Sequence, residues 1–254
     1  MNNLSLILLT KNESKNVSTW KNWIGKLKKL NELVVIDDNS TDDTINILKK
    51  LASKKLKVKI LKRNLNNDFS AQRQFAVNNS SNNLILWLDA DESPSDKLVE
   101  YLNSIDTNQY VNYSFKRADI FLGHTLHYGE TASQYFLRLF DKRYGYFSGS
   151  VHELWQSSKP TLSQDLEIIH QSHPHLKGFF EKINFYSEIR ARELFNTKTP
   201  TNLTEIILFP LGKFIQNYFF KLGFLDGTPG IILALGMSFH SFLVRAKLWC
   251  LYNP

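Results

Sequence analysis

The sequence contains a single cysteine, Cys250, so an internal disulfide framework is excluded. Its first ten residues lack a basic n-region and a small-residue cleavage site, and their apolar run covers only residues 6–9. This pattern predicts no signal peptide. Both absences favour a reducing, cytosolic setting, because disulfide-poor chains are typical of that compartment.

Two nucleotide-binding motifs are also missing. The chain has no G-x-G-x-x-G and no G-x-x-x-x-G-K-[ST], which excludes the dinucleotide fingerprint and the phosphate-binding loop. Three histidines lie close together at His170, His173 and His175, but they have no cysteine partners and fit no standard zinc spacing. We therefore expect no zinc site there.

The composition is that of a globular protein, with 43% hydrophobic and 22% charged residues. A chain of 254 residues suits one large domain or one domain with an appendage. The net charge of +7 is concentrated between Lys15 and Arg63, where thirteen Lys or Arg face five Asp or Glu. Such a region can meet nucleic acid, an anionic membrane or a phosphorylated substrate, but a solvated helix face explains it equally well.

The first third of the chain alternates between short apolar runs and segments with helical periodicity. The apolar runs predict strands over residues 4–10, 33–37, 58–61 and 84–89. The periodic segments predict helices over residues 14–29, 41–51 (with Thr41 as N-cap) and 69–79. Strands and helices that alternate at this spacing predict an α/β fold with a doubly wound sheet.

Polar residues follow the end of each predicted strand, where doubly wound sheets bind their ligands. They are Thr10, Lys11, Asn12 and Glu13, then Asp37, Asp38, Asn39 and Ser40, then Arg63 and Asn64, and finally Asp89, Asp91 and Glu92. Carboxylates this close need a cation, and their oxygens suit Mg²⁺ or Mn²⁺ shared with substrate phosphates. The alternative is an acidic helix start capped by Ser93 or Ser95, which explains Glu92 but not Asp89.

Four stretches, "LTKNESKNV", "VVIDDNSTDDT", "AQRQFAV" and "LWLDADE", resemble in order and spacing the nucleotide-sugar domain of glycosyltransferase family 2. Two later stretches, "YFLRLFDKRYGYFSGSVHE" and "KLGFLDGTPG", resemble the branch that contains lipopolysaccharide-core β-1,4-glucosyltransferases. The resemblance implies a GT-A fold, a Rossmann-like doubly wound mixed sheet. It also implies an inverting transfer of a hexose from a nucleotide-diphosphate sugar, such as a UDP-hexose, with Mg²⁺ or Mn²⁺ as cofactor.

The resemblance also suggests roles for individual residues. It places the nucleotide sugar against Thr10, Asn12, Glu13, Asp38, Gln72, Arg73 and Asp89. Asp38 would read the base, Gln72 and Arg73 would lie near the diphosphate, and Asp89 would meet the ribose or the metal. Asp91 is the predicted direct metal ligand. Many relatives have alanine where this chain has Gln72.

An inverting displacement requires a general base for the acceptor hydroxyl. We predict Glu153, in "SGSVHELW", as this base and His152 as a metal ligand or an orienter of the diphosphate. A surface pair on a strand is the alternative for these two residues. Arg73, with Arg138 or Arg143 further out, is predicted to stabilise the leaving group. The stretch 123–130, which contains Gly123 and Gly129, predicts a turn or hairpin that lines the acceptor cleft.

The last third of the chain is aromatic and apolar. We predict a catalytic domain over residues 1–175 and a helical extension over 176–254, with helices over 176–195, 206–225 and 231–249. The uncharged core 231–244 is shorter than the ~20 residues of a spanning helix. We therefore expect amphipathic helices in a membrane interface, with a wet stripe of Lys213, Gln216, Asn217 and Lys221. Helical packing or a dimer contact is the alternative.

The predicted protein is thus a metal-dependent hexosyltransferase for a lipid-linked or lipopolysaccharide-type acceptor. We expect it to lie on the inner side of the cytoplasmic membrane and to bind no nucleic acid. Two rival classes remain. A basic nucleic-acid-binding protein would explain the charge but not the acids at adjoining strand ends. A non-catalytic nucleotide-sugar-binding module would keep those acids and dispense with Glu153.

Overall fold

The structure, a computed structural model, describes residues 3–66, 68–105, 112–131, 134–149 and 154–253. The chain divides into two compact units. A sheet unit consists of Met1–Arg117 and Tyr135–His170, and a helical unit consists of Ala118–Gln134 and Gln171–Pro254. The predicted start of the helical extension after residue 175 lies close to the boundary between His170 and Gln171. The inclusion of Ala118–Gln134 in the helical unit was not predicted.

The main sheet is mixed, with strand order β3-β2-β1-β4-β8-β6-β11-β5. Its parallel half consists of β1 (Leu4–Thr10), β2 (Leu30–Asp37), β3 (Lys57–Lys62) and β4 (Leu84–Trp87). The remaining strands are β5 (Glu92–Pro94), β6 (Asn112–Phe121), β8 (Tyr135–Asp141) and β11 (Thr161–His173). Strand β8 pairs antiparallel with β4 and with β6. A short strand, β7 (His124–Thr125), pairs with β6, and β9 (Gly145–Ser148) pairs with β10 (Leu154–Ser157).

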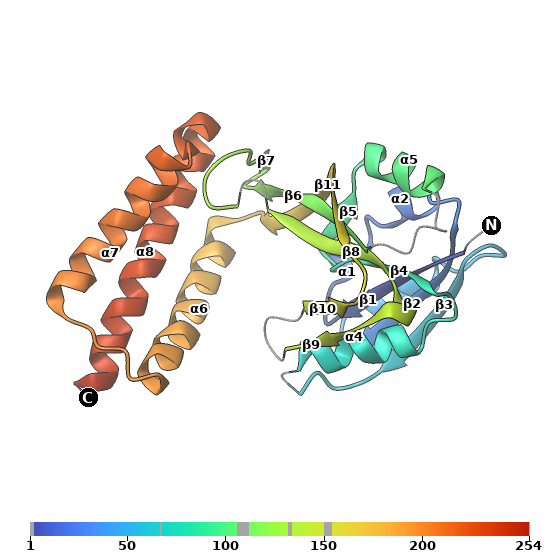
Figure 1. The fold of residues 1–254 in the computed structure, drawn as a ribbon, viewed down its shortest axis with the longest axis horizontal. Helices are drawn as coiled ribbons and strands as arrows, with labels where there is room; N and C mark the ends of the chain where they lie inside the picture. The colour runs from blue at the N-terminus through green and yellow to red at the C-terminus, as the bar shows by residue number, and fades with distance from the viewer. Residues whose placement is uncertain (1–2, 67, 106–111, 132–133, 150–153, 254) are drawn as a thin grey trace. The chain divides into compact units, whose positions relative to one another are not determined.

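Both faces of β1, β2 and β4 are buried, so these strands are apolar at consecutive positions instead of alternating, while the edge strand β3 is only half-buried. Leu6 and Leu8 of β1 point into one core, and Ile7 points into the other. The first core includes side chains of α1 (Ser14–Val17), α2 (Lys21–Ile24), α3 (Thr44–Lys49) and α5 (Asp96–Ser104). The second includes α4 (Phe69–Asn78), which lies on the opposite side of the sheet from α5 (Figure 1). The predicted doubly wound α/β fold is confirmed.

Two helices differ from the prediction for identifiable local reasons. Residues 14–29 form two short helices because the Ser18 and Thr19 hydroxyls donate to backbone carbonyls three residues back, which competes with a continuous helix. Thr41 is not the cap of α3, since its N–H and hydroxyl both donate to Asn12 Oδ1. The helix instead starts after Asp43.

The helical unit contains three long helices and two short irregular turns. They are α6 (Leu176–Asn196), α7 (Leu203–Ile215), the π-helical turn η2 (Gln216–Phe220), the 3₁₀ turn η3 (Gly223–Asp226) and α8 (Gly227–Tyr252). Helix α8 packs against α6 and α7. The hairpin of β6 and β7, predicted from its glycines, adds Phe121 and Leu126 to the core that Phe179, Ile183 and Leu233 form.

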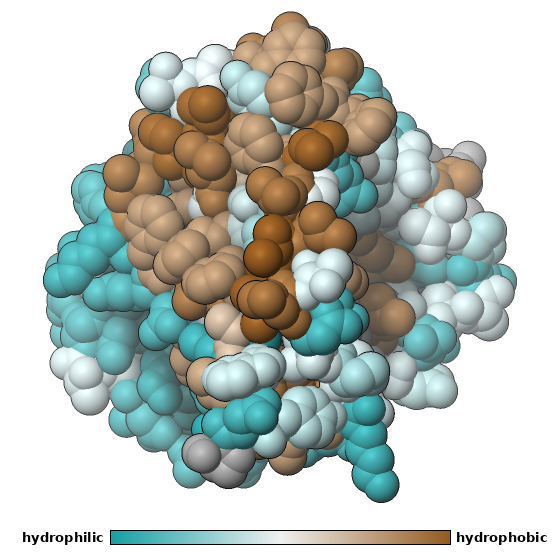
Figure 2. All heavy atoms as spheres, turned by 90° about the vertical axis from the view of Figure 1, so that its left-hand side faces the viewer, coloured by the Kyte–Doolittle hydropathy of each residue, from teal (hydrophilic) through white to brown (hydrophobic). Residues whose placement is uncertain are grey.

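Large apolar side chains remain exposed on the helical unit. Figure 2 views the side on which α7 and α8 lie in Figure 1 and shows these side chains gathered over a broad area of that face. None of the side chains of α7 is buried. The predicted wet polar stripe is wrong for two of its four residues, because Asn217 is only 2% exposed and Lys213 is paired with Glu130, whereas Gln216 is exposed.

Candidate functional site

The three clustered carboxylates lie in a tight turn that follows β4. The N–H of Glu92 donates to the carbonyl of Asp89 at 3.0 Å, and the N–H of Asp89 donates back to Glu92 Oε2 at 3.1 Å. Trp20 Nε1 holds the turn from the α1–α2 segment by donating to the Ala90 carbonyl at 3.2 Å. This closure explains why the strand stops at Trp87, two residues before Asp89.

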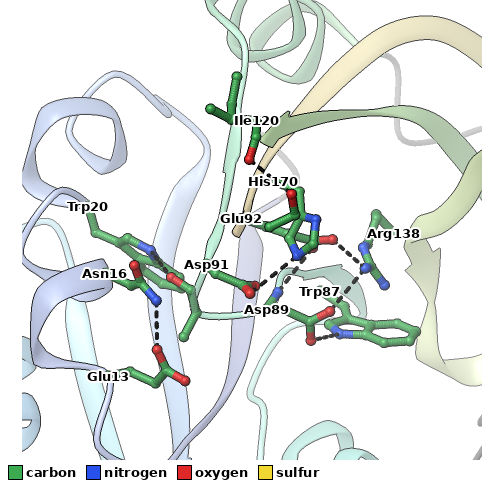
Figure 3. Close-up of polar contacts among 12 residues, drawn as sticks. Glu13, Asn16, Trp20, Trp87, Asp89, Asp91, Glu92, Ile120, Arg138 and His170 are labelled. Atoms are coloured by element: carbon green, nitrogen blue, oxygen red, sulfur yellow. Dashed lines mark hydrogen bonds and ion pairs between the residues drawn. The ribbon is translucent and has the colours of Figure 1, made fainter. Parts of the chain in front are cut away.

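Two buried arginines neutralise part of the negative charge. Arg138 of β8 donates to Asp89 at 3.1 Å and to the nearly inaccessible Glu92 at 2.7 Å, and Arg73 of α4 donates to Asp89 at 3.1 Å. Both guanidinium groups lie over the ring of Trp87, at 3.8 Å for Arg73 and 4.4 Å for Arg138. Figure 3 shows Trp87, Asp89, Glu92 and Arg138 close together. The chain itself thus supplies cations for Asp89 and Glu92.

The Asp89 carboxyl is held in its ionised form. Burial alone would raise its pKa, but the charges of Arg73 and Arg138, together with hydrogen bonds from Trp87 and Arg73, outweigh burial and hold the pKa well below its usual value. A carboxylate that is already shared by two arginines is a poor candidate for binding a metal. Two of the three acids predicted to need an external cation, Asp89 and Glu92, thus have arginine partners in the chain itself.

Asp91 lies beside a histidine that is distant in sequence. His170 Nε2 lies 3.2 Å from Asp91 Oδ2, and the two side chains are 18% and 28% exposed (Figure 3). Antiparallel pairing of β11 with β5 sets His170 opposite Glu92 and so brings it to the turn. Among the described residues, no group of three or more His, Cys, Asp or Glu side chains converges on a metal position. A carboxylate and an imidazole still fit a divalent ion whose other ligands are phosphate oxygens and water.

The ends of β1 and β2 form a second polar group beside the first. The Asp38 N–H donates to the Thr10 carbonyl at 2.9 Å, and Asn12 adopts left-handed backbone geometry with φ of 56°. Lys11 donates to Asp38 at 2.9 Å, and this hydrogen bond lowers the pKa of Asp38. The buried hydroxyl of Thr10 has no partner among the residues that the structure describes. Because β1 lies between β2 and β4, this group adjoins the turn at Asp89.

Two further predicted residues are fixed by side-chain contacts. Both ends of the Gln72 amide bond to Arg63: it donates to the Arg63 carbonyl at 2.7 Å and accepts from the guanidinium at 2.8 Å. Gln72 is only 1% exposed, which suits a residue that positions Arg63. Glu13 accepts from Asn16 at 2.7 Å, and its own N–H donates to Thr44.

Three other predicted residues remain. His152 and Glu153 lie outside the described residues. Arg143 pairs with Asp141 at 2.6 Å in an exposed position. Of the two arginines predicted further out, Arg138 is thus the one that lies among the carboxylates.

Comparison with known proteins agrees with this arrangement. The sequence profile described as "Glycosyl transferase family 2" matches residues 5–147, more than half of the chain. The chain belongs to glycosyltransferase family 2. The predicted family is thereby confirmed, and the chain is a glycosyltransferase.

Individual relatives extend the similarity over nearly the whole glycosyltransferase. An uncharacterized glycosyltransferase of Rickettsia typhi is 26% identical over 98% of this chain and 87% of its own length. One of Rickettsia prowazekii is 25% identical with the same coverage. A mannosyltransferase of Pyrobaculum calidifontis, solved with GDP-Man and Mn²⁺, has a TM-score of 0.55 at 12% identity, covering 97% of this chain and 86% of its own. At that identity it supports the fold, which is GT-A-like as predicted.

Two residues of this candidate site are not predicted by the sequence. Local patterns place His170 only in a histidine cluster and Trp87 only in a strand. The signal for His170 is a strand pairing across more than seventy residues, which no local pattern encodes. Trp87 was visible in the sequence, but its role depends on two arginines that come from α4 and β8.

Proposed function

We propose that this glycosyltransferase transfers a hexose, with inversion, from a nucleotide-diphosphate sugar such as a UDP-hexose to a surface-glycan acceptor. The observation that carries the proposal is the Asp91–His170 pair beside an arginine-fixed Asp89 at the carboxyl end of β4. The nucleotide lies at the ends of β1 and β2, against Thr10, Asn12, Glu13 and Asp38. This is the edge at which doubly wound sheets bind ligands.

Asp91 and His170 would hold Mg²⁺ or Mn²⁺, with phosphate oxygens and water in the remaining positions. The bound ion would neutralise negative charge on the leaving diphosphate. His170 is thus the proposed histidine ligand of the metal. The sequence predicted His152 for this role, and His152 lies outside the described residues. Asp89 faces the ribose, while Arg73 and Arg138 add fixed positive charge near the diphosphate, where it needs no reorganisation during reaction.

Glu153 serves as the general base. Its carboxylate takes the proton of the acceptor hydroxyl as that oxygen forms a bond to the anomeric carbon. The bond from the anomeric carbon to the diphosphate breaks, and the diphosphate leaves with the electron pair. The acceptor is a lipid-linked or lipopolysaccharide-type glycan, and the enzyme works at the inner side of the cytoplasmic membrane.

The test compares Asp91→Asn and His170→Gln with Asp96→Asn, a matched control whose exposed carboxylate pairs with Lys26 at the protein surface. We expect both site variants to lose Mn²⁺-dependent binding of UDP-hexoses, measured by calorimetry, and to lose at least about 10²-fold in turnover. Asp96→Asn should behave as wild type. Ordinary Mn²⁺-dependent turnover in Asp91→Asn would overturn the proposed site.

A non-catalytic binding module is the second candidate, since the described contacts would also suit nucleotide-sugar binding alone. Wild-type protein that binds the sugar nucleotide with Mn²⁺ but neither hydrolyses nor transfers the sugar would favour the module. Linkage analysis of the surface glycan from cells that lack the gene tests the acceptor class. An unchanged glycan would count against it.

A further inference from the structure

The segment from Leu203 to Thr228 has inverted polarity. Its exposed side chains carry no charge, and eleven of them are large and apolar. They are Leu203, Ile207, Leu208, Phe209, Leu211, Ile215, Phe219, Phe220, Leu222, Phe224 and Leu225, which we call the apolar face. Their exposed fractions reach 80% at Phe220.

Three of the four charged residues in this segment, and one amide, point inward to a partner, whereas Gln216 is exposed and Lys221 is half-buried. Lys213 donates to Glu130 at 2.7 Å, Asn217 donates to the same carboxylate at 2.8 Å, and Glu205 pairs with Arg245 at 3.1 Å. The Asp226 carboxylate accepts from two backbone N–H groups of the hairpin, those of His127 and Tyr128. A helix at a water surface shows the opposite arrangement, with its apolar stripe inside and its charges outside.

The charged residues of α7, α8 and the turns between them are also held by partners inside the unit, with one exception. Between Leu203 and Tyr252 the charged residues are Glu205, Lys213, Lys221, Asp226, Arg245 and Lys247. All except Lys221 have partners within the helical unit, including Lys247, which donates to Asn184 and Ser187. Charged groups held inside and large apolar groups turned outside are expected where the surrounding solvent is hydrocarbon.

We infer that the apolar face inserts into the surface layer of a lipid bilayer. This inference rests on the proposed function only for the lipid-linked acceptor. It adds to that function the surface through which the enzyme reaches the lipid. Large contiguous apolar patches on a protein surface usually mark an interaction site. Trp249 and Tyr252, both exposed near the end of α8, are the residue types that favour the headgroup region.

Insertion in the surface layer suits the helices better than spanning. The stretch Gly223–Tyr252 is long and apolar enough to cross a bilayer by length and composition, so the expectation that its apolar part is too short was wrong. Pro229 and Gly230 do not interrupt it, because they lie in the first turn of α8. Yet α8 packs against both α6 and α7 and carries Arg245 and Lys247 in ion pairs. It is therefore the central helix of the unit, and α7 with its following turns provides the contact with lipid.

The experiment measures flotation of the full chain with vesicles of phosphatidylcholine and phosphatidylglycerol. The test variants are Leu208→Glu and Phe220→Glu. The matched control is Phe185→Glu, since Phe185 is 61% exposed but lies on the face of α6 opposite Phe179 and Ile183. We expect each test variant to weaken binding about tenfold or more, because one large apolar side chain no longer enters the hydrocarbon. The control should bind as wild type, and binding should survive high salt.

Three outcomes would overturn the inference. Equal loss in the control would show that the apolar face is not the specific contact. Loss of wild-type binding in high salt would assign it to the basic residues of 15–63 instead. A wild-type dimer that binds no vesicles and that Phe220→Glu converts to monomers would identify a contact between two copies of the chain.

Mn²⁺-dependent hydrolysis of the sugar nucleotide is measured in the same variants. Retained hydrolysis with lost flotation supports the inserted face and leaves the transferase site intact. Absent hydrolysis in the wild type, with normal flotation, is a failure of the proposed function alone.

Discussion

The sheet unit and the segment Leu203–Thr228 of the helical unit place their charges in opposite ways. In the sheet unit, β1 is buried along almost its whole length, while lysines such as Lys11, Lys15 and Lys21 are exposed. In the helical unit, Lys213 and Asn217 are turned inward, and Leu208 and Phe220 are exposed. With the inferred insertion into lipid, the two regions sort the same amino-acid types for water and for hydrocarbon, and burial has to be judged against the solvent of each.

Each unit also holds carboxylates with partners inside it, and they differ in whether an oxygen remains available to a ligand. Glu130 of the helical unit has both oxygens occupied, one by Lys213 and the other by Asn217. In the sheet unit, Asp89 and Glu92 are held by arginines, whereas Asp91 is partly exposed beside His170. A carboxylate with both oxygens occupied, such as Glu130, stabilises the fold, whereas a partly exposed carboxylate beside an imidazole, such as Asp91, can also bind a ligand.

The largest effect is expected on kcat, and it distinguishes Glu153 from Glu130. Glu153→Gln should lower kcat by about 10²–10⁴, because a general base typically contributes that much, and should leave donor affinity nearly unchanged. Glu130→Gln should leave kcat within a few-fold at temperatures where the protein is folded. Steady-state kinetics and donor titration check both. A loss confined to donor binding in Glu153→Gln would assign that residue another role.

The second effect is on stability. Arg138→Met should lower the free energy of unfolding by about 3–5 kcal/mol, because the buried Glu92 would lose its charge partner. Arg143→Met is the control, since Arg143 forms an exposed pair with Asp141 and should change stability by about 1 kcal/mol or less. Urea unfolding measures both. Equal stability of the two variants would contradict the assigned role of Arg138.

A smaller effect is expected in the helical unit. Glu130→Gln should destabilise it by about 1–3 kcal/mol, because Lys213 loses its charged acceptor inside the unit. Hydrogen exchange at α7 and η2 should speed up accordingly. Glu193→Gln, which removes an exposed pair with Arg190, should leave the exchange of these elements unchanged. Unaltered exchange in Glu130→Gln would mean that the inward polar contacts do not hold α7.

The smallest effect tests the inverted polarity directly. Phe220→Ala should change the free energy of unfolding in buffer by about 0.5 kcal/mol or less, since Phe220 is 80% exposed. Phe140→Ala, at a site that is 0% exposed, should cost about 3–5 kcal/mol. Thermal and urea unfolding without lipid measure both. A large cost at Phe220 would show that its ring packs against the protein.

The sequence predicted the sheet unit well where the periodicity was strong. The strands at 4–10, 33–37 and 58–61 and the helix at 69–79 match the structure within a few residues. Their apolar runs are long and bounded by polar residues. The helix at 14–29 was overextended because the hydroxyls of Ser18 and Thr19 compete for backbone carbonyls, which an apolar count does not record.

The site was less predictable from the sequence. Local patterns showed which acids end a strand, but not which of them the chain itself neutralises. That depends on Arg73 and Arg138, which α4 and β8 bring to Asp89. The helical unit misled the prediction for a related reason. Helical periodicity places Lys213 and Asn217 on one stripe, but it does not say whether that stripe faces water or Glu130.

The helical unit is built from two separate stretches of chain, and this has a consequence for how the protein is made. Phe121 and Leu126 of the hairpin are synthesised well before Phe179 and Leu233, the residues that cover them. At about 5–20 residues per second, the ribosome leaves this hairpin without its partners for seconds. Its apolar side chains are exposed during that interval, and chaperones bind exposed apolar side chains. A chain shortened near Pro200 would keep Phe179 but lose Leu233 for good, so removing α7 and α8 deletes a contact surface and also leaves the hairpin only partly covered.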